Sequence, residues 1–258
     1  MALLEIKEMN HAFGGIQAVD HFNLRLKGGE LNGLIGPNGA GKTTIFNLVS
    51  GFYQPTSGQI FFRNTNTAGL KPHRITGLGL ARTFQNIRIW PEMTVLDNIR
   101  VAHHHSLGYG FLDCIFRTPT FLRREREVTT AAYEILESLN LKDYAQELPK
   151  NLPYGLRRIV EIARALATRP ALLMLDEPAA GLTSADLQGL IDMIRMIHQT
   201  FQITIWMIEH QMQVVMDLCQ YIQCIDFGVT IAEGTPDHIQ NNPAVIKAYL
   251  GDDTFQCC

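Results

Sequence analysis

The stretch from Gly36 to Thr44, which reads GPNGAGKTT, constrains the fold of this chain more than any other. It fits the pattern G-x-x-x-x-G-K-[ST], with Gly36, Gly41, Lys42 and Thr43 at the fixed positions. Small residues at this spacing let backbone N–H groups curl around an anion. The pattern is therefore typical of a loop that binds phosphate groups.

The residues on either side of the loop support this interpretation. The apolar run at 31–35 predicts a short buried strand, and residues 43–49 predict the start of a helix. A helix N-terminus adds its positive end to such an anion site. We expect Lys42 to reach the β- and γ-phosphates of a nucleotide and Thr43 to reach a Mg²⁺ ion. The alternative is a glycine turn in which Thr43 only caps the helix.

Composition excludes several other classes of protein. The chain has 258 residues, 46% of them hydrophobic, and contains no apolar run long enough to span a bilayer. Charged residues in MALLEIKEMN leave no export signal there. A net charge of −3 gives no reason to expect nucleic acid as a partner. The five cysteines form no C-x-x-C pair, which suits a protein of a reducing compartment. The last two residues, Cys257 and Cys258, are either part of a frayed tail or a metal, lipid or redox site.

Strands and helices alternate along most of the chain. Continuous apolar runs at 171–175 and 203–208 predict buried strands, and Ser184 is the expected N-cap of a helix that reaches His198. Such alternation predicts a parallel α/β sheet. Residues 87–165 have mainly helical spacing, so we expect an α/β core from 1–86 and 166–258 with a helical insertion between its two parts.

Two features of this insertion have competing interpretations. His103-His104-His105 could bind a metal, but consecutive residues point in different directions on a helix and cannot form one site from a single face. The cluster from Arg123 to Arg126 could contact phospholipid or a partner, or it could be a solvated helix face with interspersed glutamates.

Ionisable residues follow the predicted strands at their carboxyl ends, which is where parallel sheets bind ligands. Asp176 and Glu177 end one strand and His210 follows another. Asp176 is placed to help hold Mg²⁺, and Glu177 is placed as the general base for a water that attacks the γ-phosphate. His210 and the loop residue Gln85 are polar candidates for the same site.

With these features together, the chain resembles the ATP-binding cassette (ABC) ATPases over residues 3–250. This resemblance implies a RecA-like P-loop ATPase core with an antiparallel β part and an inserted helical subdomain, that is, one ABC nucleotide-binding domain at 1–258. It also implies that two cassettes hold two ATP molecules between them. The motifs that carry it are Gly36–Thr43, Gln85, Leu152-Pro153-Tyr154-Gly155, the strand that ends at Asp176-Glu177, and His210.

The resemblance also implies roles for individual residues. Phe13 matches the aromatic position that stacks on adenine, Gln85 the Q-loop glutamine and Mg²⁺ ligand, and Glu177 and His210 the catalytic glutamate and switch histidine. Tyr154 and Gly155 match the signature segment that caps the ATP of the opposite subunit. The whole loop matches the nucleotide-binding loop: Gly36, Pro37, Asn38, Gly39, Ala40, Gly41, Lys42, Thr43 and Thr44.

The chain departs from the family pattern at several positions. Pro153 replaces the serine of L-S-G-G-Q and Leu156 replaces its glutamine. Thr183 stands where the aspartate of the D-loop usually follows the Walker B aspartate. ATP binding by the glycine loop is untouched by these changes, but they affect how this subunit would complete the site of its partner.

The L-P-Y-G signature, the segment DEPAAG at 176–181 and the arginine-rich insertion near 117–126 resemble one branch of the family in particular, the ATPase subunits of branched-chain amino acid importers. The resemblance implies a cytoplasmic subunit, peripheral on the inner face of the cell membrane, that pairs with an identical or paralogous cassette. Two transmembrane permease subunits and, indirectly, a periplasmic binding protein would complete the importer. A coupling helix would dock on the surface formed by residues 87–91, Met93 and Val95, although the apolar residues there could equally belong to the core.

Three other functions are compatible with parts of the sequence. A lipid or lipopolysaccharide exporter would use the same kind of cassette. A soluble ABC protein of DNA repair or translation usually carries two cassettes or long coiled coils, and the chain has neither heptads nor an internal repeat. A P-loop GTPase would need a base-reading N-K-x-D, and no Asn-Lys dipeptide occurs.

Overall fold

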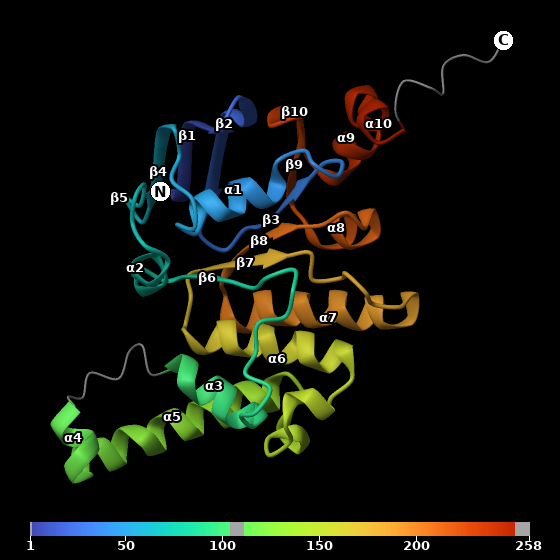
Figure 1. Cartoon of the computed structure of the whole chain (residues 1–258). Coiled ribbons are helices and arrows are strands. Elements are labelled where there is room, and N and C mark those ends of the chain that lie inside the picture. Colours follow the sequence, from blue (N-terminus) through green and yellow to red (C-terminus); the bar gives the residue numbers. More distant parts are fainter. Residues whose placement is uncertain (1, 104–110, 251–258) are drawn as a thin grey trace. The chain divides into compact units, whose positions relative to one another are not determined.

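The computed structural model describes residues 2–103 and 111–250, which form two compact units (Figure 1). The core unit consists of Met1–Arg82 and Ala171–Cys258, and the helical unit of Thr83–Pro170. The sequence pattern places these boundaries at 86/87 and 165/166, a few residues inside the helical unit. The chain from Thr83 onwards belongs to the helical unit because two side chains of its last helix bind the backbone of residues 84, 85 and 88.

An antiparallel sheet forms one layer of the core unit, with the strand order β2-β1-β4-β5. Apolar residues alternate with polar ones along its long strands, so one face is buried and the other faces solvent. Gly14 has a positive φ of 57° in the tight turn between the first two strands. The strands are β1 (Ala2–Phe13), β2 (Ile16–Lys27), β4 (Ser57–Phe62) and β5 (Thr65–Asn66).

A six-stranded sheet forms the second layer, in the order β10-β9-β3-β8-β7-β6. Only the edge pair β9 and β10 is antiparallel. Strands β3, β7 and β8 are buried along their whole length, which is why each reads as a continuous apolar run. The bounds are β3 (Leu31–Ile35), β6 (Leu80–Arg82), β7 (Leu172–Asp176), β8 (Thr204–Ile208), β9 (Tyr221–Asp226) and β10 (Val229–Gly234).

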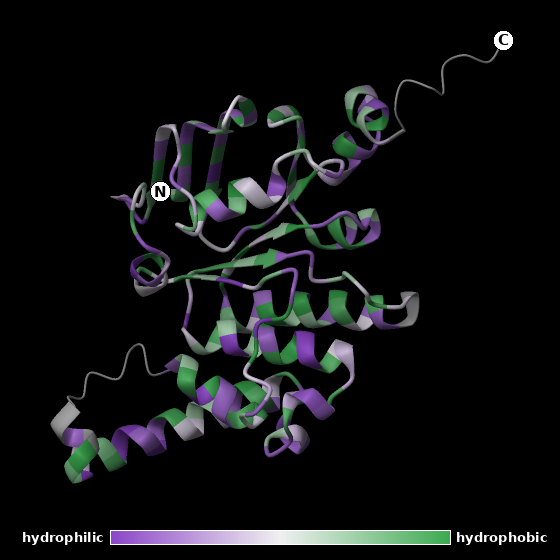
Figure 2. Ribbon diagram, viewed as in Figure 1, coloured by the Kyte–Doolittle hydropathy of each residue, from purple (hydrophilic) through white to green (hydrophobic). Residues whose placement is uncertain are grey.

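Helix α1 (Lys42–Val49) packs between these two layers. Ile45 and Phe46 are fully buried in a cluster that includes residues of both sheets, and the Phe46 ring lies 4.7 Å from the ring of Trp206 on β8. The hydropathy colouring of Figure 2 shows green along the central strands on which the helix lies. The helix that follows the phosphate loop is therefore fixed by the main core of the unit.

The remaining helices of the core unit surround the sheets. Helix α8 (Met212–Leu218) packs so closely on β3 that a Cβ at Gly33 would lie 3.0 Å from the sulfur of Cys219. Helix α7 (Ser184–Phe201) is N-capped by Thr183, whose hydroxyl accepts from the Asp186 N–H, so the prediction that Ser184 is the cap is wrong by one residue. The others are α2 (Pro72–Gly77), α9 (Pro236–Gln240) and α10 (Pro243–Leu250).

The helical unit contains α3 (Val95–His103), α4 (Phe111–Phe116), α5 (Pro119–Ser138) and α6 (Tyr154–Ala167). Its core includes Val128 and Ala132 of α5 and Val160 of α6. His103 is buried, while His104 and His105, like Cys257 and Cys258, lie outside the described residues. Within residues 2–103 and 111–250, no three His, Cys, Asp or Glu side chains gather as metal ligands, and no helix is long and apolar enough to cross a bilayer.

Candidate functional site

The loop between β3 and α1 has the backbone conformation that only glycine accommodates easily. Gly36, Gly39 and Gly41 have φ values of 151°, 82° and 102°. A Cβ at Gly36 would lie 2.1 Å from the carbonyl oxygen of Ile225, and one at Gly41 would lie 2.4 Å from that of Ala18. The loop is therefore held tightly against neighbouring strands, in a shape that larger residues at these positions would destroy.

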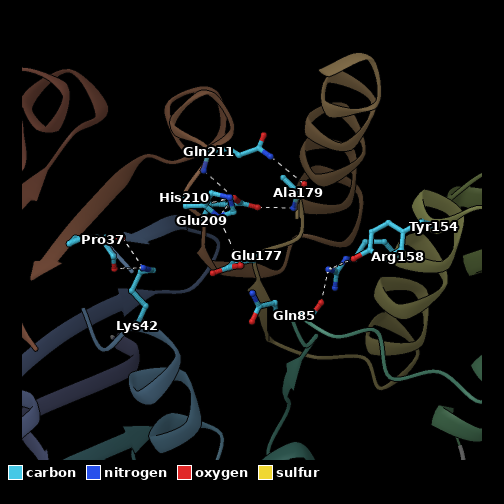
Figure 3. A network of polar contacts seen from close by, with 11 residues as sticks. Pro37, Lys42, Gln85, Tyr154, Arg158, Glu177, Ala179, Glu209, His210 and Gln211 are labelled. Carbon is cyan, nitrogen blue, oxygen red and sulfur yellow. Dashed lines mark hydrogen bonds and ion pairs between the residues drawn. The ribbon is translucent and has the colours of Figure 1, made fainter. Parts of the chain in front are cut away.

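Lys42 lies inside this loop, where it is almost completely buried. Its Nζ donates hydrogen bonds to the carbonyl oxygens of Gly36, at 2.7 Å, and Pro37, at 2.9 Å (Figure 3). Burial lowers the pKa of the ammonium group, and the nearby carboxylate of Glu177 acts in the opposite direction. The loop thus carries a preoriented positive charge.

The start of α1 adds backbone donors to this charge. The helical hydrogen bonds begin with the Ile45 N–H donating to Gly41, and the first N–H groups of a helix have no partner within it. Asn38, Gly39 and Thr43 are exposed at the same end, whereas Ala40 is buried. A cradle of N–H groups around one ammonium group fits a phosphate chain.

The acidic and histidine candidates lie together at the carboxyl ends of β7 and β8. The Glu177 N–H donates to the carbonyl oxygen of Ile208, and the His210 Nδ1 lies 3.9 Å from the Glu177 Oε2. Glu177 has a left-handed φ of 49°, a conformation that is uncommon outside glycine and is often found at functional sites. The structure therefore brings the predicted general base and the predicted switch histidine into one group.

Glu209, which no motif in the sequence indicates, holds this group together. Its carboxylate is fully buried and accepts from the N–H groups of Ala179, at 2.7 Å, His210, at 3.1 Å, and Gln211, at 3.3 Å. Burial raises the pKa of Glu209, although these three N–H groups oppose the shift. Because Ala179 follows β7 and His210 follows β8, one side chain fixes both segments at the strand ends.

Asp176 forms a buried ion pair that its position at a strand end did not predict. Its Oδ2 lies 2.7 Å from Nη2 of Arg82, and the two side chains are 3% and 4% exposed. Arg82 also donates from Nη1 to the side-chain oxygens of Asn47 and Ser50 on and after α1. The arginine at the end of β6 therefore ties α1 to the predicted metal ligand.

Replacing Arg82 by Leu should lower the free energy of unfolding by about 3–5 kcal/mol, because it leaves a buried carboxylate without its cation. Urea unfolding followed by circular dichroism would measure the loss. Arg195→Leu is the matched control, since Arg195 pairs with Asp192 at the surface and its side chain is 44% exposed. Equal stability of the two variants would contradict the importance of the buried pair.

Phe13 ends β1 as part of a cluster of three rings. Its ring lies edge-on to His11, at 4.6 Å, and to Tyr53, at 5.4 Å, while His11 and Tyr53 stack on each other. Phe13 remains 46% exposed, so part of its ring is available to another planar group. The sequence pointed to Phe13 alone. His11 lies two residues earlier on the same strand, β1, and Tyr53 approaches Phe13 from the turn after α1.

In the helical unit, Arg158 links the two predicted site segments. Its guanidinium group donates to the carbonyl oxygens of Phe84, through Nη1, and of Gln85, at 2.9 Å, and it lies 3.3 Å from the hydroxyl of Tyr154 (Figure 3). Glu161 pairs with Arg158 at 2.9 Å and accepts from the Phe84 and Arg88 N–H groups. The structure therefore connects the backbone at Gln85 with the first turn of α6, where Tyr154 and Gly155 lie.

The residues of the core unit fit a nucleotide with its magnesium ion. The cradle around Lys42 suits a phosphate chain, and the Thr43 hydroxyl and the Asp176 carboxylate would supply oxygen ligands of the kind that Mg²⁺ prefers. Mg²⁺ is commonly held by one or two carboxylates together with substrate phosphates, so a larger cluster of acidic residues is not needed.

This combination of glycine loop, carboxylates at strand ends and inserted helical unit defines a P-loop nucleoside triphosphatase with a cassette architecture. Residues 19–180 match the family model of the ABC transporter, and the chain belongs to that family. Residues 229–254 match a second model, described as the branched-chain amino acid ATP-binding cassette transporter.

Among curated proteins, the chain is 44% identical over 250 residues to the high-affinity branched-chain amino acid transport ATP-binding protein BraF of Pseudomonas aeruginosa. It is 43% identical over 250 residues to LivG of Escherichia coli, which carries the same description. Each match covers 97% of this chain and 98% of the relative. The probable LivG of Archaeoglobus fulgidus is 34% identical, over 100% of this chain and 99% of the relative.

Solved structures agree with the fold. An ATP-binding cassette of an ABC transporter in its ADP conformation superposes with a TM-score of 0.84 at 29% identity, over 98% of this chain and 100% of the other. A nucleotide-free ATP-binding cassette superposes with a TM-score of 0.83 at the same identity. The predicted α/β core with an antiparallel part and a helical insertion is confirmed.

Proposed function

We propose that this chain is the ATP-hydrolysing subunit of an ABC importer for branched-chain amino acids, peripheral on the cytoplasmic face of the membrane. The observation that carries the proposal is the identity of 43–44%, over nearly the whole length, to ATP-binding proteins of branched-chain amino acid transport. The match of the C-terminal segment to the branched-chain family model supports the same branch.

Each residue of the core site has a role in this proposal. Lys42 and the loop N–H groups bind the phosphates, Thr43 and Asp176 hold Mg²⁺, and Phe13 contacts the adenine ring. Mg²⁺ would neutralise the charge of the phosphates when bound. Glu177 accepts the proton of the attacking water, and His210, 3.9 Å from it, is placed to donate a hydrogen bond on the same side.

A second cassette, identical or paralogous, would complete each nucleotide site. Helix α6 begins at Tyr154, and its N-cap residue, Pro153, has no side-chain group that caps the helix. The first N–H groups of α6 therefore need another acceptor, and a phosphate bound to the opposite subunit would supply one. This proposal gives Tyr154 and Gly155 their role at the partner's nucleotide.

Two permease subunits would dock on the segment that follows Gln85, with a periplasmic binding protein beyond them. Trp90 is 45% exposed, and the Arg164 guanidinium lies 4.9 Å from its ring centroid. Val95 is fully buried at the start of α3, so of the two interpretations the core position holds for this residue, and Val95 does not belong to the surface. Trp90 is the exposed aromatic residue that an entering helix would contact.

Replacing Trp90 by Ala should uncouple transport from ATP hydrolysis while sparing nucleotide binding. The Asn98 side chain accepts from the Trp90 N–H and donates to the carbonyl oxygens of Trp90, Met93 and Thr94, so the loop backbone keeps its support when the ring is removed. Removing an aromatic anchor from an interface costs about 2 kcal/mol or more, which corresponds to a loss of roughly 30-fold in affinity for the permease subunits.

Uptake of radiolabelled leucine in cells, together with nucleotide titration of the purified variant, would measure the two effects separately. Tyr144→Ala is the matched control, because Tyr144 is an exposed aromatic residue of the same unit in the turn after α5. Normal uptake with Trp90→Ala would remove this residue from the proposed interface.

The proposed function itself is tested by complementation. A strain that lacks its own branched-chain cassette would receive this chain together with the membrane-subunit genes that accompany it. We expect ATP-dependent uptake of leucine, isoleucine and valine to return with the wild-type chain. Uptake that does not depend on this chain, or recovery of export of a lipid instead, would overturn the proposal.

A further inference from the structure

The C-terminal helix of the core unit makes a direct hydrogen bond to the phosphate loop. The hydroxyl of Tyr249, near the end of α10, accepts from the Gly36 N–H at 2.9 Å across 213 residues of sequence. Tyr249 is 37% exposed, so its ring is not a core residue, while its hydroxyl is directed at the loop. The polar contact is therefore the specific feature of this side chain.

Gly36 is held by several contacts at the start of the loop. Its N–H is bound by Tyr249, its carbonyl oxygen is bound by Lys42, and the carbonyl oxygen of Ile225 occupies the place where a side chain would be. Because Gly36 is buried, its N–H needs an acceptor inside the protein. Tyr249 thus binds the N–H of Gly36, and the carbonyl oxygen of the same residue positions the Lys42 ammonium.

We propose that Tyr249 is a positioning residue for the nucleotide-binding loop: its hydroxyl fixes Gly36, and Gly36 in turn fixes the Lys42 ammonium that contacts the phosphates. The inference rests on the nucleotide site proposed above. Without the hydroxyl, the Gly36 N–H loses its acceptor and the loop is less ordered in the free protein. Part of the entropy cost of ordering the loop then falls on nucleotide binding, which weakens it.

Two further observations describe where Tyr249 lies in the chain and in the fold. Tyr249 lies within residues 229–254, which match the branched-chain family model, whereas the match to the general ABC model ends at residue 180. A groove of about 530 Å³ separates the loop residues Pro37 to Ala40 from Ala244 and Ala248 of α10. The helix and the loop therefore face each other across open space, and the Tyr249 hydroxyl bridges them.

Tyr249→Phe removes only the hydroxyl oxygen and tests the proposal on the full chain. We expect the Kd for ADP to rise about three- to tenfold, the range that corresponds to one net hydrogen bond. In steady-state hydrolysis, KM for ATP should rise by a larger factor than kcat falls, because the loop is needed for binding before and during the reaction. Titration with a fluorescent ADP analogue and phosphate-release kinetics would measure these quantities.

Tyr221→Phe is the matched control, because it makes the same chemical change elsewhere in the core unit. The Tyr221 hydroxyl bonds to Glu233, and Tyr221 begins β9 beside Asn32, at the end of β3 away from the phosphate loop. Its Kd for ADP should equal that of the wild type. An equal rise in both variants would mean that the Tyr249 effect is a general loss of stability.

Amide hydrogen exchange gives a readout that a purely structural role would not affect. If α10 and the loop are coupled through Tyr249, ADP must stabilise α10 in return, since coupling is reciprocal. We expect ADP to slow exchange in residues 243–249 of the wild-type chain and to have less effect in Tyr249→Phe. Unchanged affinity and exchange in Tyr249→Phe, with normal ADP binding by the wild type, would overturn this inference alone, whereas absent ADP binding by the wild type would overturn the proposed function.

Discussion

Replacing Glu177 by Gln should lower the rate of ATP hydrolysis by about 10²- to 10⁴-fold, the contribution typical of a general base. Glutamine has nearly the same shape, but its amide cannot accept the proton of the attacking water. Hydrogen bonds to the backbone at Glu177 should persist, because they involve its N–H and the Ile208 carbonyl oxygen. ATP binding should therefore remain, and a dimer closed around ATP should accumulate.

Phosphate release and size-exclusion chromatography with and without ATP would measure both expectations. Glu137→Gln serves as the control, since Glu137 pairs with Lys142 on the surface of the helical unit, where its side chain is 66% exposed. Turnover of Glu177→Gln at the wild-type rate would remove Glu177 from its proposed role.

Replacing Lys42 by Met should weaken the binding of ADP and ATP by about 100-fold or more. Met keeps most of the length and the apolar stem of the side chain but loses the charge. A hydrogen bond to a charged group contributes about 1.5–3 kcal/mol. The loss of two such bonds to phosphate therefore exceeds the roughly 2.7 kcal/mol of binding free energy that corresponds to a 100-fold change in Kd. The variant should still fold, because the stem continues to fill the buried site.

AMP provides an internal test of the Lys42 assignment. If the ammonium contacts the β- and γ-phosphates, AMP should bind wild type and Lys42→Met with similar, weak affinity, while ADP discriminates between them. Equal loss for all three nucleotides would instead indicate a collapsed loop. Lys142→Met, at an exposed position of the helical unit, is the control for the substitution itself.

The sequence predicted the parts of the site that are local in the chain. The glycine loop, the strand ends at Asp176 and His210 and the helical insertion follow from spacing and apolar runs, which fix backbone geometry over a few residues. Helix α8 and strands β9 and β10 were not predicted. In β9, a buried polar residue, Gln223, interrupts the apolar pattern.

The residues that align the site could not be found in the same way. Arg82, Glu209 and Arg158 act through contacts to segments 30 to 94 residues away in the chain, and Tyr249 acts across 213 residues. A lone buried ionisable residue at a strand or helix end gives no sign of which backbone groups it will bind. An ionisable residue that follows an apolar strand and stands next to a motif residue, as Glu209 stands next to His210, is the sequence signal that could have indicated such a role.

The path by which the chain enters and leaves the helical unit limits how cassettes of this kind can vary. Strand β6 ends at Arg82 and β7 begins at Leu172, yet the two strands run parallel, with Leu80 beside Leu172. A chain that connects adjacent parallel strands must return along the full length of a strand, so the whole helical unit is the crossover of one βαβ unit. Evolution can therefore lengthen, shorten or redecorate this unit, but it cannot delete the unit and close the gap with a tight turn.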